Sequence, residues 1–458
     1  MCLAIFNGLR VRKYKLSEQF RPSFSLIVPS HNEEKVIERT INNFLKIRYP
    51  QNKKEMIIIN DGSADRTKEI IEKYASKIID SDSGEVTKTE NSFGKIILIN
   101  RQSGGSGKAN ALNCGNKHAS GEILFFIDAD IQFDEDVFER ASRHFIDEKV
   151  GAVSGYVQVV ENKNSFLNQF LDFEYVVGQQ FIRRGFNVIG IHYIVPGGCA
   201  IFRRKMLEKV GGYHSDTLAE DTDITWRIIT ETKNEIHFDP SIVVAADEPT
   251  GLIALWNQRV RWARGNIEVT LKHKHKIGNP KYGRGVTWGY PFWIGAMILP
   301  FAFILSSVGL VLATIFNLQL DILPIFGKFL GVSFFVSWIA ATIMNKGRSW
   351  LAGLLTPGIP ALISLSTLLI IDNISGDLFS TLGYSQFSIL PGLLIGLWIL
   401  ISIPGTYLCI GLANKFPKLS AVLQFGVFGY WMFIITSIFH GYIKEIFKQE
   451  KKWIRTER

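Results

Sequence analysis

The stretch Ile123–Asp130, which reads ILFFIDAD, decides the fold class because an apolar run ends there in two carboxylates. Ile123–Ile127 predicts a buried strand, and Asp128 and Asp130 follow directly at its carboxyl end. Open α/β sheets bind their ligands at that edge. Two carboxylates so close in sequence suit a hard divalent cation that keeps coordination positions for phosphate oxygens. The stretch therefore predicts a metal site at Asp128 and Asp130.

Strand-like and helix-like segments alternate around this stretch, from Phe24 to about residue 160. The predicted strands are near-continuous apolar runs at 24–29, 56–60, 95–99 and 123–127, and segments with helical spacing separate them. Strands of this kind are buried on both faces, so the pattern indicates a mostly parallel sheet between helical layers. A polar, turn-rich segment at 80–94 is predicted to be a loop.

Polar side chains follow the ends of separate predicted strands. Asn32 and Glu33 come after the first strand, and Asp61 comes after the second. Because the carboxyl ends of parallel strands meet at one edge, these residues should converge with Asp128 and Asp130. Carboxylates at this edge can accept hydrogen bonds from a base or a ribose, so the edge suits a nucleotide.

Lys108 follows the glycine-rich segment Gly104–Gly107, and its ammonium group suits a diphosphate. A Walker-type phosphate loop is the alternative, but that loop requires Ser or Thr after the lysine, and this chain has Ala109. Lys108 is therefore predicted to neutralise phosphates outside a Walker loop.

Glu220 and Asp221 open a predicted helix and together form the best candidate for a general base. A carboxylate beside an acceptor hydroxyl can take its proton while the oxygen attacks. The alternative is structural, since acidic residues in a first helical turn also interact favourably with the helix dipole.

Gln258, Arg261 and Trp262 share one face of a predicted helix by their spacing. An amide, a guanidinium and a large aromatic ring together suit a sugar and a diphosphate. The alternative is a helix that lies on a membrane surface, and the two interpretations are compatible.

The second half of the chain is dominated by apolar runs. Five of them are predicted membrane spans because each is at least as long as the about 20 residues that cross a bilayer: 289–316, 322–344, 351–371, 388–413 and 420–443. The formal net charge of +9 is then explained by cytoplasmic Lys and Arg facing anionic lipid, rather than by a nucleic-acid partner. Four scattered cysteines without a CxxC pair exclude a zinc ribbon and argue against a disulfide scaffold.

The charge pattern leaves the number of crossings open. Lys346, Arg348 and the basic tail 444–458 are predicted to be cytoplasmic. Five crossings from a cytoplasmic domain would place the tail outside, so either the proline-containing segment 351–371 does not cross or the charge bias fails here.

Four motifs follow one another in the order Asp61-Gly62-Ser63, Asp128-Ala129-Asp130, Glu220-Asp221 and Gln258-x-x-Arg261-Trp262. In this order they resemble the membrane-embedded processive β-glycosyltransferases of glycosyltransferase family 2. That group includes cellulose, chitin and hyaluronan synthases and bacterial poly-N-acetylglucosamine synthases. The resemblance covers about residues 22 to 275 through motifs and the remainder through architecture. It implies an α/β GT-A nucleotide-sugar-binding domain followed by an α-helical transmembrane bundle.

The implied domain order runs from a basic, interfacial stub at 1–22 to a GT-A domain at 23–250. Interfacial helices with the Gln-x-x-Arg-Trp motif follow at 251–285, then transmembrane helices at 286–443 and a basic cytoplasmic tail at 444–458. Relatives usually carry one or two spans before the catalytic domain, where this chain has the short apolar stub.

The resemblance also implies a role for each motif residue. The nucleotide sugar would be bound by Asn32, Glu33, Asp61, Lys108, Asp128 and Asp130, of which Asp128 and Asp130 would hold Mg²⁺ or Mn²⁺. Asp221, with Glu220 beside it, would be the catalytic base. The acceptor and the diphosphate would be held by Gly198, Cys199, Gln258, Arg261 and Trp262.

The expected function is an inverting, processive glycosyltransferase in the plasma membrane, with a cytoplasmic catalytic domain and several spans. It would polymerise a β-linked polysaccharide from a UDP-sugar, with UDP-N-acetylglucosamine favoured and UDP-glucose next, and guide the glycan across the bilayer. Expected partners are the donor, the growing glycan, the lipid bilayer and an accessory membrane subunit.

Two alternatives belong to different classes. A non-processive transferase would move one sugar to a polyprenyl phosphate or another lipid, but the Gln258–Trp262 motif speaks against it. A transport or scaffold protein would carry an inactive transferase domain. The presence of every acidic motif residue, from Asp61 to Asp221, argues against that alternative.

Overall fold

The computed structural model describes residues 20–89, 94–101, 107–160, 166–295, 297–298 and 421–449. The chain divides into two compact units, of which one comprises Cys2–Tyr175, Ile182–Ile294 and His440–Arg458 and the other comprises Met1, Val176–Phe181 and Gly295–Phe439. Every candidate site residue belongs to the first of these units, which we call the sheet unit.

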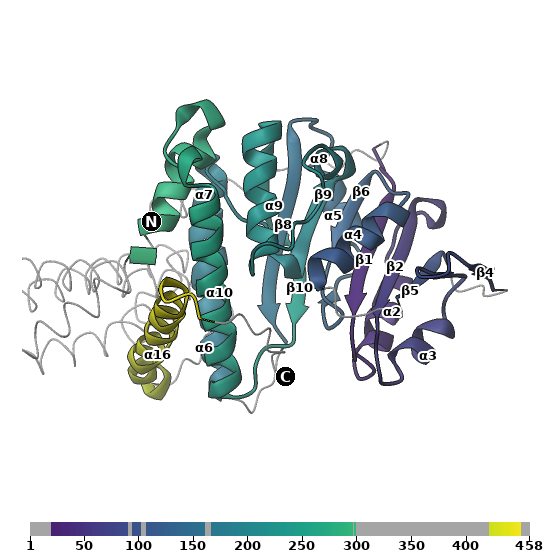
Figure 1. The fold of residues 1–458 in the computed structure, drawn as a ribbon, viewed down its shortest axis with the longest axis horizontal. Helices are drawn as coiled ribbons and strands as arrows, with labels where there is room; N and C mark the ends of the chain where they lie inside the picture. The colour runs from purple at the N-terminus through teal and green to yellow at the C-terminus, as the bar shows by residue number, and fades with distance from the viewer. Residues whose placement is uncertain are drawn as a thin grey trace, which may run out of the picture. The chain divides into compact units, whose positions relative to one another are not determined.

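The sheet unit is built on a ten-stranded sheet with the order β4-β3-β5-β2-β1-β6-β9-β8-β10-β7 (Figure 1). Its strands are β1 (Phe24–Ser30), β2 (Lys54–Asp61), β3 (Lys77–Asp80), β4 (Val86–Lys88), β5 (Ile96–Arg101), β6 (Ile123–Phe126), β7 (Gln132–Phe133), β8 (Val150–Val159), β9 (Ala200–Arg203) and β10 (Glu235–Ala246). The four strands expected from the sequence are therefore present as β1, β2, β5 and β6.

The sheet is mixed rather than parallel throughout. Strands β3, β5, β2, β1 and β6 run parallel to one another, and β8 runs parallel to β10. Strand β9 joins the two halves by pairing antiparallel with both β6 and β8. The expectation of a mostly parallel sheet thus holds for the half that carries β1, β2 and β6. The predicted loop at 80–94 also contains a strand, because β4 pairs antiparallel with β3.

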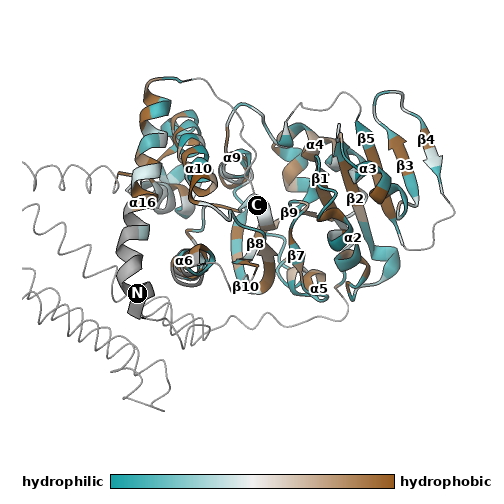
Figure 2. Ribbon diagram, turned by 90° about the horizontal axis from the view of Figure 1, so that it is seen from below, coloured by the Kyte–Doolittle hydropathy of each residue, from teal (hydrophilic) through white to brown (hydrophobic). Residues whose placement is uncertain are grey.

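Helices cover both faces of the sheet, as Figure 2 shows for α4, α9 and α10 on one side and α2, α5 and α6 on the other. The helices are α2 (Ile37–Leu45), α3 (Thr67–Glu72), α4 (Lys108–His118), α5 (Val137–Ser142), α6 (Phe166–Tyr175), α7 (Arg184–Ile189), α8 (Arg204–Lys209), α9 (Glu220–Arg227), α10 (Leu252–Lys272) and α16 (Ala421–Ile446). Single turns of other helix types occur at η1 (Gln51–Lys53), η3 (Gly197–Cys199), η5 (Lys274–Lys276) and η6 (Pro280–Tyr282), and π-helical segments at η2 (Val176–Arg183), η4 (Ile228–Thr232) and η7 (Gly285–Gly289).

Alternating residues of the strands feed two separate cores. Leu26 and Val28 of β1 pack with apolar side chains of α2, α3 and α5, whereas Ile27 packs with those of α4, α8, α9 and α10. This division is what a period-two strand between two helical layers requires. The strand register then places the carboxyl ends of β1, β2 and β6 at one edge, with Ser30 opposite Asn60 and Ile27 opposite Phe126.

Helix α10 approaches α9 closely. A Cβ atom on Gly265 would lie 2.8 Å from the Cβ of Ala219, so only glycine allows this contact. One turn later, Glu268 accepts a hydrogen bond of 2.6 Å from the backbone N–H of Leu218. Helix α10 is therefore attached to the residues that directly precede Glu220.

No helix in the described parts of the chain is both long and apolar enough to cross a bilayer. The predicted spans at 289–316, 322–344, 351–371 and 388–413 lie wholly or mostly outside the described residues. The span at 420–443 falls on α16, whose residues 440–446 belong to the sheet unit. The predicted transmembrane bundle thus gains no support from the described residues.

Candidate active site

The loops after β1 and β2 are joined by hydrogen bonds. Asn32 has a left-handed backbone with φ 57°, a conformation that asparagine tolerates better than most residues. Its Oδ1 accepts from the N–H of Ala64 at 2.7 Å, and its own N–H donates to Ser63 Oγ at 3.0 Å. The N–H of Glu33 donates to Thr67 Oγ1 at 2.7 Å. These contacts place Asn32 and Glu33 beside the end of β2.

Asp61 ends β2 and forms an ion pair with Arg101 at the end of β5, with Nη1 and Oδ1 3.1 Å apart. Each of these side chains is 12% exposed. The strand register brings them together, because Asp61 and Arg101 are cross-strand partners. Sequence reasoning found Asp61 but missed Arg101, because a single arginine at the end of a strand carries no motif.

Lys108, Asp128 and Glu220 meet at the carboxyl edge of the sheet. The ammonium nitrogen of Lys108 lies 2.5 Å from Asp128 Oδ1 and 3.8 Å from Glu220 Oε1. A Cβ atom on Gly197 would lie 3.4 Å from that nitrogen and 3.7 Å from Asp221 Oδ2. Residues from α4, β6, η3 and α9 therefore form one cluster, which we call the acid cluster (Lys108, Asp128, Glu220, Asp221).

Charge shifts within the acid cluster follow from its composition. Burial alone would lower the pKa of Lys108, but the carboxylates of Asp128, Glu220 and Asp221 outweigh burial and raise it. Burial raises the pKa of Glu220, Lys108 opposes that shift and the charge of Asp221 adds to it. Lys108 therefore stays charged at neutral pH while three carboxylates share its single positive charge.

Asp221 is oriented by backbone groups. Its Oδ2 accepts from the N–H of Gly197 at 2.9 Å, and its Oδ1 accepts from the N–H of Thr222 at 2.7 Å. The Thr222 hydroxyl also donates to Oδ1, at 3.3 Å. An ionised carboxylate has about four acceptor positions, so about one remains for an incoming hydroxyl group. The geometry suits a general base that is held in place before substrate arrives.

Asp128 and Asp130 differ in exposure. The Asp128 side chain is 30% exposed, whereas Asp130 is 2% exposed as a residue. Arg39 donates to the backbone oxygen of Asp130 at 2.9 Å and to Asp247 at 2.6 Å, which fixes the turn after β6. Oxygen donors in a cluster with more carboxylates than cations suit Mg²⁺ or Mn²⁺, so Asp128 within the acid cluster fits the predicted ion.

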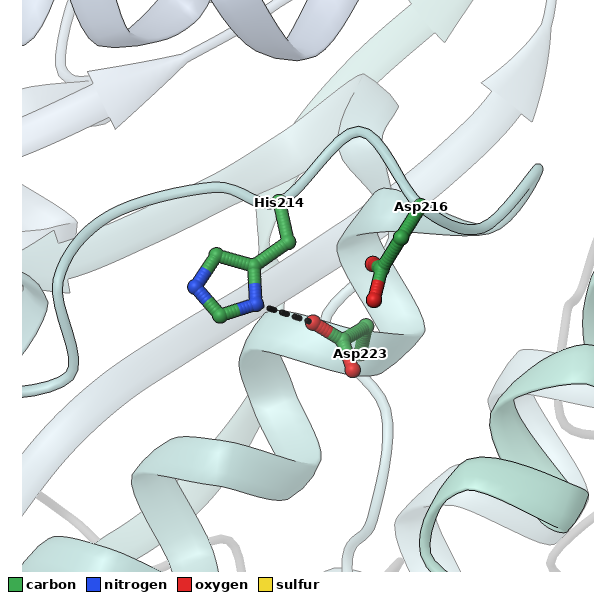
Figure 3. A group of neighbouring side chains, drawn as sticks. All are labelled: His214, Asp216 and Asp223. Atoms are coloured by element: carbon green, nitrogen blue, oxygen red, sulfur yellow. Dashed lines mark ion pairs between the residues drawn. The ribbon is translucent and has the colours of Figure 1, made fainter.

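A second group with metal-binding residue types comprises His214, Asp216 and Asp223, whose ligand atoms lie within 4.8 Å of one another (Figure 3). Cationic side chains already surround its central carboxylate. Asp223 lies 2.8 Å from Arg227 Nε and 2.9 Å from both Lys272 Nζ and His273 Nε2. We therefore interpret this hub (His214, Asp216, Asp223, Arg227, Lys272, His273) as structural, because its positive groups leave little attraction for a further cation.

Gly198 and Cys199 follow Gly197 in η3, at the start of β9. Cys199 is fully buried, and a Cβ atom on Gly155 would lie 2.7 Å from its sulfur. Burial raises the pKa of the Cys199 thiol to about 12. The side chain of Cys199 thus belongs to the core, which leaves only its backbone and that of Gly198 for contact with an acceptor.

The three predicted residues on α10 differ in environment. Gln258 is 7% exposed, Arg261 is half-buried, and Trp262 is 38% exposed. The Gln258 amide donates to Glu248 Oε2 at 3.2 Å and accepts from Arg259 Nη1 at 2.7 Å. Arg259 was not predicted as a site residue, although it is 2% exposed and contacts both Gln258 and Trp262.

Arg261 and Trp262 precede Gly265 by one helical turn, so they lie on the side of α10 that faces the residues before Glu220. The attachment of Gly265 and Glu268 to Leu218 and Ala219 therefore joins the helix that carries the Gln-x-x-Arg-Trp motif to the residues directly before Glu220.

Two protein families match this sequence. The family described as "Glycosyl transferase family 2" matches residues 25–211, and the one described as "Glycosyl transferase family group 2" matches residues 123–413. The second match extends over more than half of the 458 residues.

Individual relatives agree with these matches. "Probable glycosyltransferase YdaM" of Bacillus subtilis (strain 168) is 29% identical over 322 residues, which are 68% of this chain and 71% of the relative. "Poly-beta-1,6-N-acetyl-D-glucosamine synthase" of Staphylococcus epidermidis is 33% identical over 269 residues, which are 58% of this chain and 60% of the relative. The chain therefore matches less than two thirds of the length of that synthase.

A solved structure has a similar fold. The mannosyltransferase PcManGT from Pyrobaculum calidifontis, in complex with GDP-Man and Mn²⁺, aligns with a TM-score of 0.53. The alignment covers 98% of this chain and 96% of that one at 18% sequence identity. At this identity the likeness concerns the fold alone, and it confirms the predicted GT-A-like α/β domain.

Proposed function

The chain belongs to glycosyl transferase family group 2, and on that premise we propose that it is an inverting, processive β-glycosyltransferase. Its donor would be a UDP-sugar, with UDP-N-acetylglucosamine favoured and UDP-glucose next. The Staphylococcus epidermidis relative, a poly-beta-1,6-N-acetyl-D-glucosamine synthase, supports the preference for an N-acetylglucosamine donor.

The acid cluster is the observation that carries this proposal. Lys108 lies 2.5 Å from Asp128, which follows β6, and 3.8 Å from Glu220 of α9, and the N–H of Gly197 donates to Asp221. These contacts support a site in which a carboxylate for a cation, an ammonium group for a phosphate and an oriented carboxylate lie together.

The proposed reaction assigns one task to each group. Asp221 takes the proton from the acceptor hydroxyl as its oxygen forms the new bond to the anomeric carbon. The bond from that carbon to the diphosphate breaks on the opposite face, so the configuration inverts and UDP leaves. Lys108 neutralises charge on the departing diphosphate. Mg²⁺ or Mn²⁺ held by Asp128 and Asp130 would stabilise the same charge.

The acceptor end of the glycan is assigned to α10 and to η3. Trp262 would stack on a pyranose ring, Arg261 and Gln258 would bind the diphosphate and the acceptor, and the Gly198 and Cys199 backbone would line the acceptor. Asn32, Glu33 and Asp61 would form the nucleoside end of the donor site. Attachment of α10 to the residues before Glu220 supports a continuous path between the two ends.

We further propose that the enzyme resides in the plasma membrane with its catalytic domain in the cytoplasm and guides its product across the bilayer. The support for this is the series of apolar runs between residues 289 and 443. An accessory membrane subunit would be a partner of that region.

A panel of UDP-sugars tests the proposal on the purified full-length chain. UDP release should be greatest with UDP-N-acetylglucosamine, and the product should be a polymer that a linkage-specific hydrolase degrades. A single transferred sugar, extractable into organic solvent, would instead indicate transfer to a polyprenyl phosphate. Absence of UDP release from every donor in the presence of Mn²⁺ would contradict any transferase activity.

A further inference from the structure

We infer that Arg259 is a positioning residue that fixes the amide of Gln258 and the indole ring of Trp262 for the acceptor. Arg259 lies between Gln258 and Arg261, at a position that the Gln-x-x-Arg-Trp pattern leaves open. The inference rests on the proposed function, because it concerns how the acceptor side of that site is held.

Five side chains, of which Arg259 is one, form a closed ring of contacts. Arg259 Nη2 donates to Glu174 Oε2 at 2.9 Å, and Arg259 Nη1 donates to Gln258 Oε1 at 2.7 Å. Gln258 Nε2 donates to one oxygen of Glu248 at 3.2 Å, and the Tyr175 hydroxyl donates to the other at 2.5 Å. Glu174 and Tyr175 are neighbours on α6, so the ring closes through the backbone.

Burial makes this ring rigid. Arg259, Gln258 and Glu248 are 2%, 7% and 9% exposed, and a buried charge is tolerated only where its partners are in place. Burial and the nearby Glu248 carboxylate raise the pKa of Tyr175, so its hydroxyl remains a donor. Rotation of any one side chain would remove at least one hydrogen bond from this buried ring, which costs free energy.

The guanidinium of Arg259 also covers one face of Trp262. The Cζ atom lies 4.3 Å from the centre of the indole ring, within the range of a cation–π interaction. Trp262 nevertheless keeps 38% of its surface exposed. A sugar that stacks on the exposed part would bind to a ring whose plane Arg259 already fixes. The entropy cost of ordering the Trp262 side chain on acceptor binding would therefore be smaller.

A purely structural role is the rival explanation, since the ring also ties α6 to α10. The two explanations differ in which substrate they affect. Loss of a structural tie would impair donor and acceptor together, whereas loss of positioning would impair the acceptor alone.

The test uses Arg259→Lys and Glu174→Gln in the full-length chain. Lysine keeps the charge but loses the forked geometry that serves Gln258 and Glu174 together. We expect the KM for a β-linked N-acetylglucosamine oligosaccharide acceptor to rise about tenfold, as loss of a partly desolvated cation–π contact predicts. The KM for UDP-N-acetylglucosamine and the rate of donor hydrolysis should change less than about twofold, and the mean product length should fall.

Arg203→Lys is the matched control. Arg203 also lies over an aromatic ring, 5.5 Å from the centre of Phe145, and donates to backbone oxygens in the sheet unit, away from the acid cluster. It should leave the acceptor KM unchanged. Equal acceptor KM values in Arg259→Lys and Arg203→Lys, or equal losses for donor and acceptor, would overturn the inference.

A binding measurement separates this inference from the proposed function. Acceptor-induced quenching of tryptophan fluorescence should be largely lost in Trp262→Phe and should require about tenfold more acceptor in Arg259→Lys. Failure of the proposed function would instead appear in the unmodified chain, as absence of polymer from every UDP-sugar.

Discussion

Two groups of carboxylates lie on either side of α9, and they differ in the balance of charge around them. In the acid cluster, the carboxylates of Asp128, Glu220 and Asp221 share the one ammonium group of Lys108. Asp223 in the hub instead lies against two cationic side chains, those of Arg227 and Lys272, and against the imidazole rings of His214 and His273.

This difference in surrounding charge indicates which carboxylates are available to take part in a reaction. Asp221 and Asp223 are two residues apart on one helix, so their side chains project in roughly opposite directions. Asp223 is saturated by neighbours that hold α9 to α10, and it stabilises the fold. The acid cluster retains an excess of negative charge, which a divalent cation and a proton from the acceptor would relieve.

Replacement of Asp221 should have the largest effect. Asp221→Asn keeps the shape and the contact with Gly197 but removes the proton acceptor, so kcat should fall by at least about a hundredfold. Binding of UDP, measured by calorimetry, should stay within about threefold of the unmodified chain because the phosphate-binding groups are intact. Retained turnover would remove Asp221 from the role of base.

Removal of metal should have the next largest effect. EDTA should abolish transfer, and Mn²⁺ should restore it, because two carboxylates and a diphosphate form the expected coordination. Asp128→Asn should raise the Mn²⁺ concentration for half-maximal binding at least about tenfold, measured by electron paramagnetic resonance.

His214→Gln provides the control for the metal prediction. It belongs to the hub and should leave Mn²⁺ affinity unchanged. If Mn²⁺ binding were lost in His214→Gln and kept in Asp128→Asn, the assignment of the two groups would be reversed.

Asp223→Asn should affect the stability of the fold rather than the rate of the reaction. It leaves Arg227, Lys272 and His273 without their central carboxylate, and breaking a buried ion pair costs about 3–5 kcal/mol. Denaturant unfolding of the full-length chain measures the loss. An equally stable Asp223→Asn variant would show that the hub holds nothing together.

This stability should depend on pH. Burial opposes ionisation of Asp223, but hydrogen bonds from His273 and Lys272 and the charge of Arg227 lower its pKa below the unfolded value of about 3.9. The contribution is therefore complete above pH 4 and is lost as the pH falls through the folded pKa. The stability difference between the unmodified chain and Asp223→Asn should narrow in that acidic range.

Asp216→Asn should have the smallest effect. Asp216 and Asp223 both lie 2.9 Å from Lys272 Nζ, but the Asp216 side chain is 58% exposed, and that of Asp223 is 0% exposed. A solvent-exposed ion pair contributes about 0–1 kcal/mol, so the variant should unfold almost as the unmodified chain does. A loss as large as that of Asp223→Asn would mean that burial does not decide the difference.

The sequence predicted the residues at the carboxyl edge of the sheet better than the surroundings of the motif on α10. Asp128 and Lys108 were expected at one site because a long apolar strand precedes the aspartate, a glycine-rich segment precedes the lysine, and parallel strands have only one carboxyl edge. Glu220 and Asp221 were also placed correctly in the first turn of a helix. The antiparallel strand β9 was missed, since a short apolar run does not reveal the direction of its pairing.

The surroundings of the motif on α10 depend on partners that no local pattern reveals. Arg259 and Glu248 are single charged residues in segments that resemble exposed surface. They become buried charges because Arg259 pairs with Glu174 of α6, and Glu248 accepts from Gln258 and from Tyr175 of α6. Cys199 was assigned to the acceptor by position, but its thiol lies in the core because Gly155 leaves room for it. Tertiary contacts decided each of these cases.

Gly265 has a consequence for genetics. A methyl group at this position would collide with the backbone nitrogen and the Cβ of Ala219, so the helix and the loop could not both stay where they are. Either displacement would shift the tryptophan and the carboxylates relative to each other. A genetic screen for loss of glycosyl transfer should therefore return position 265 alongside the acids, although glycine contributes no reactive group.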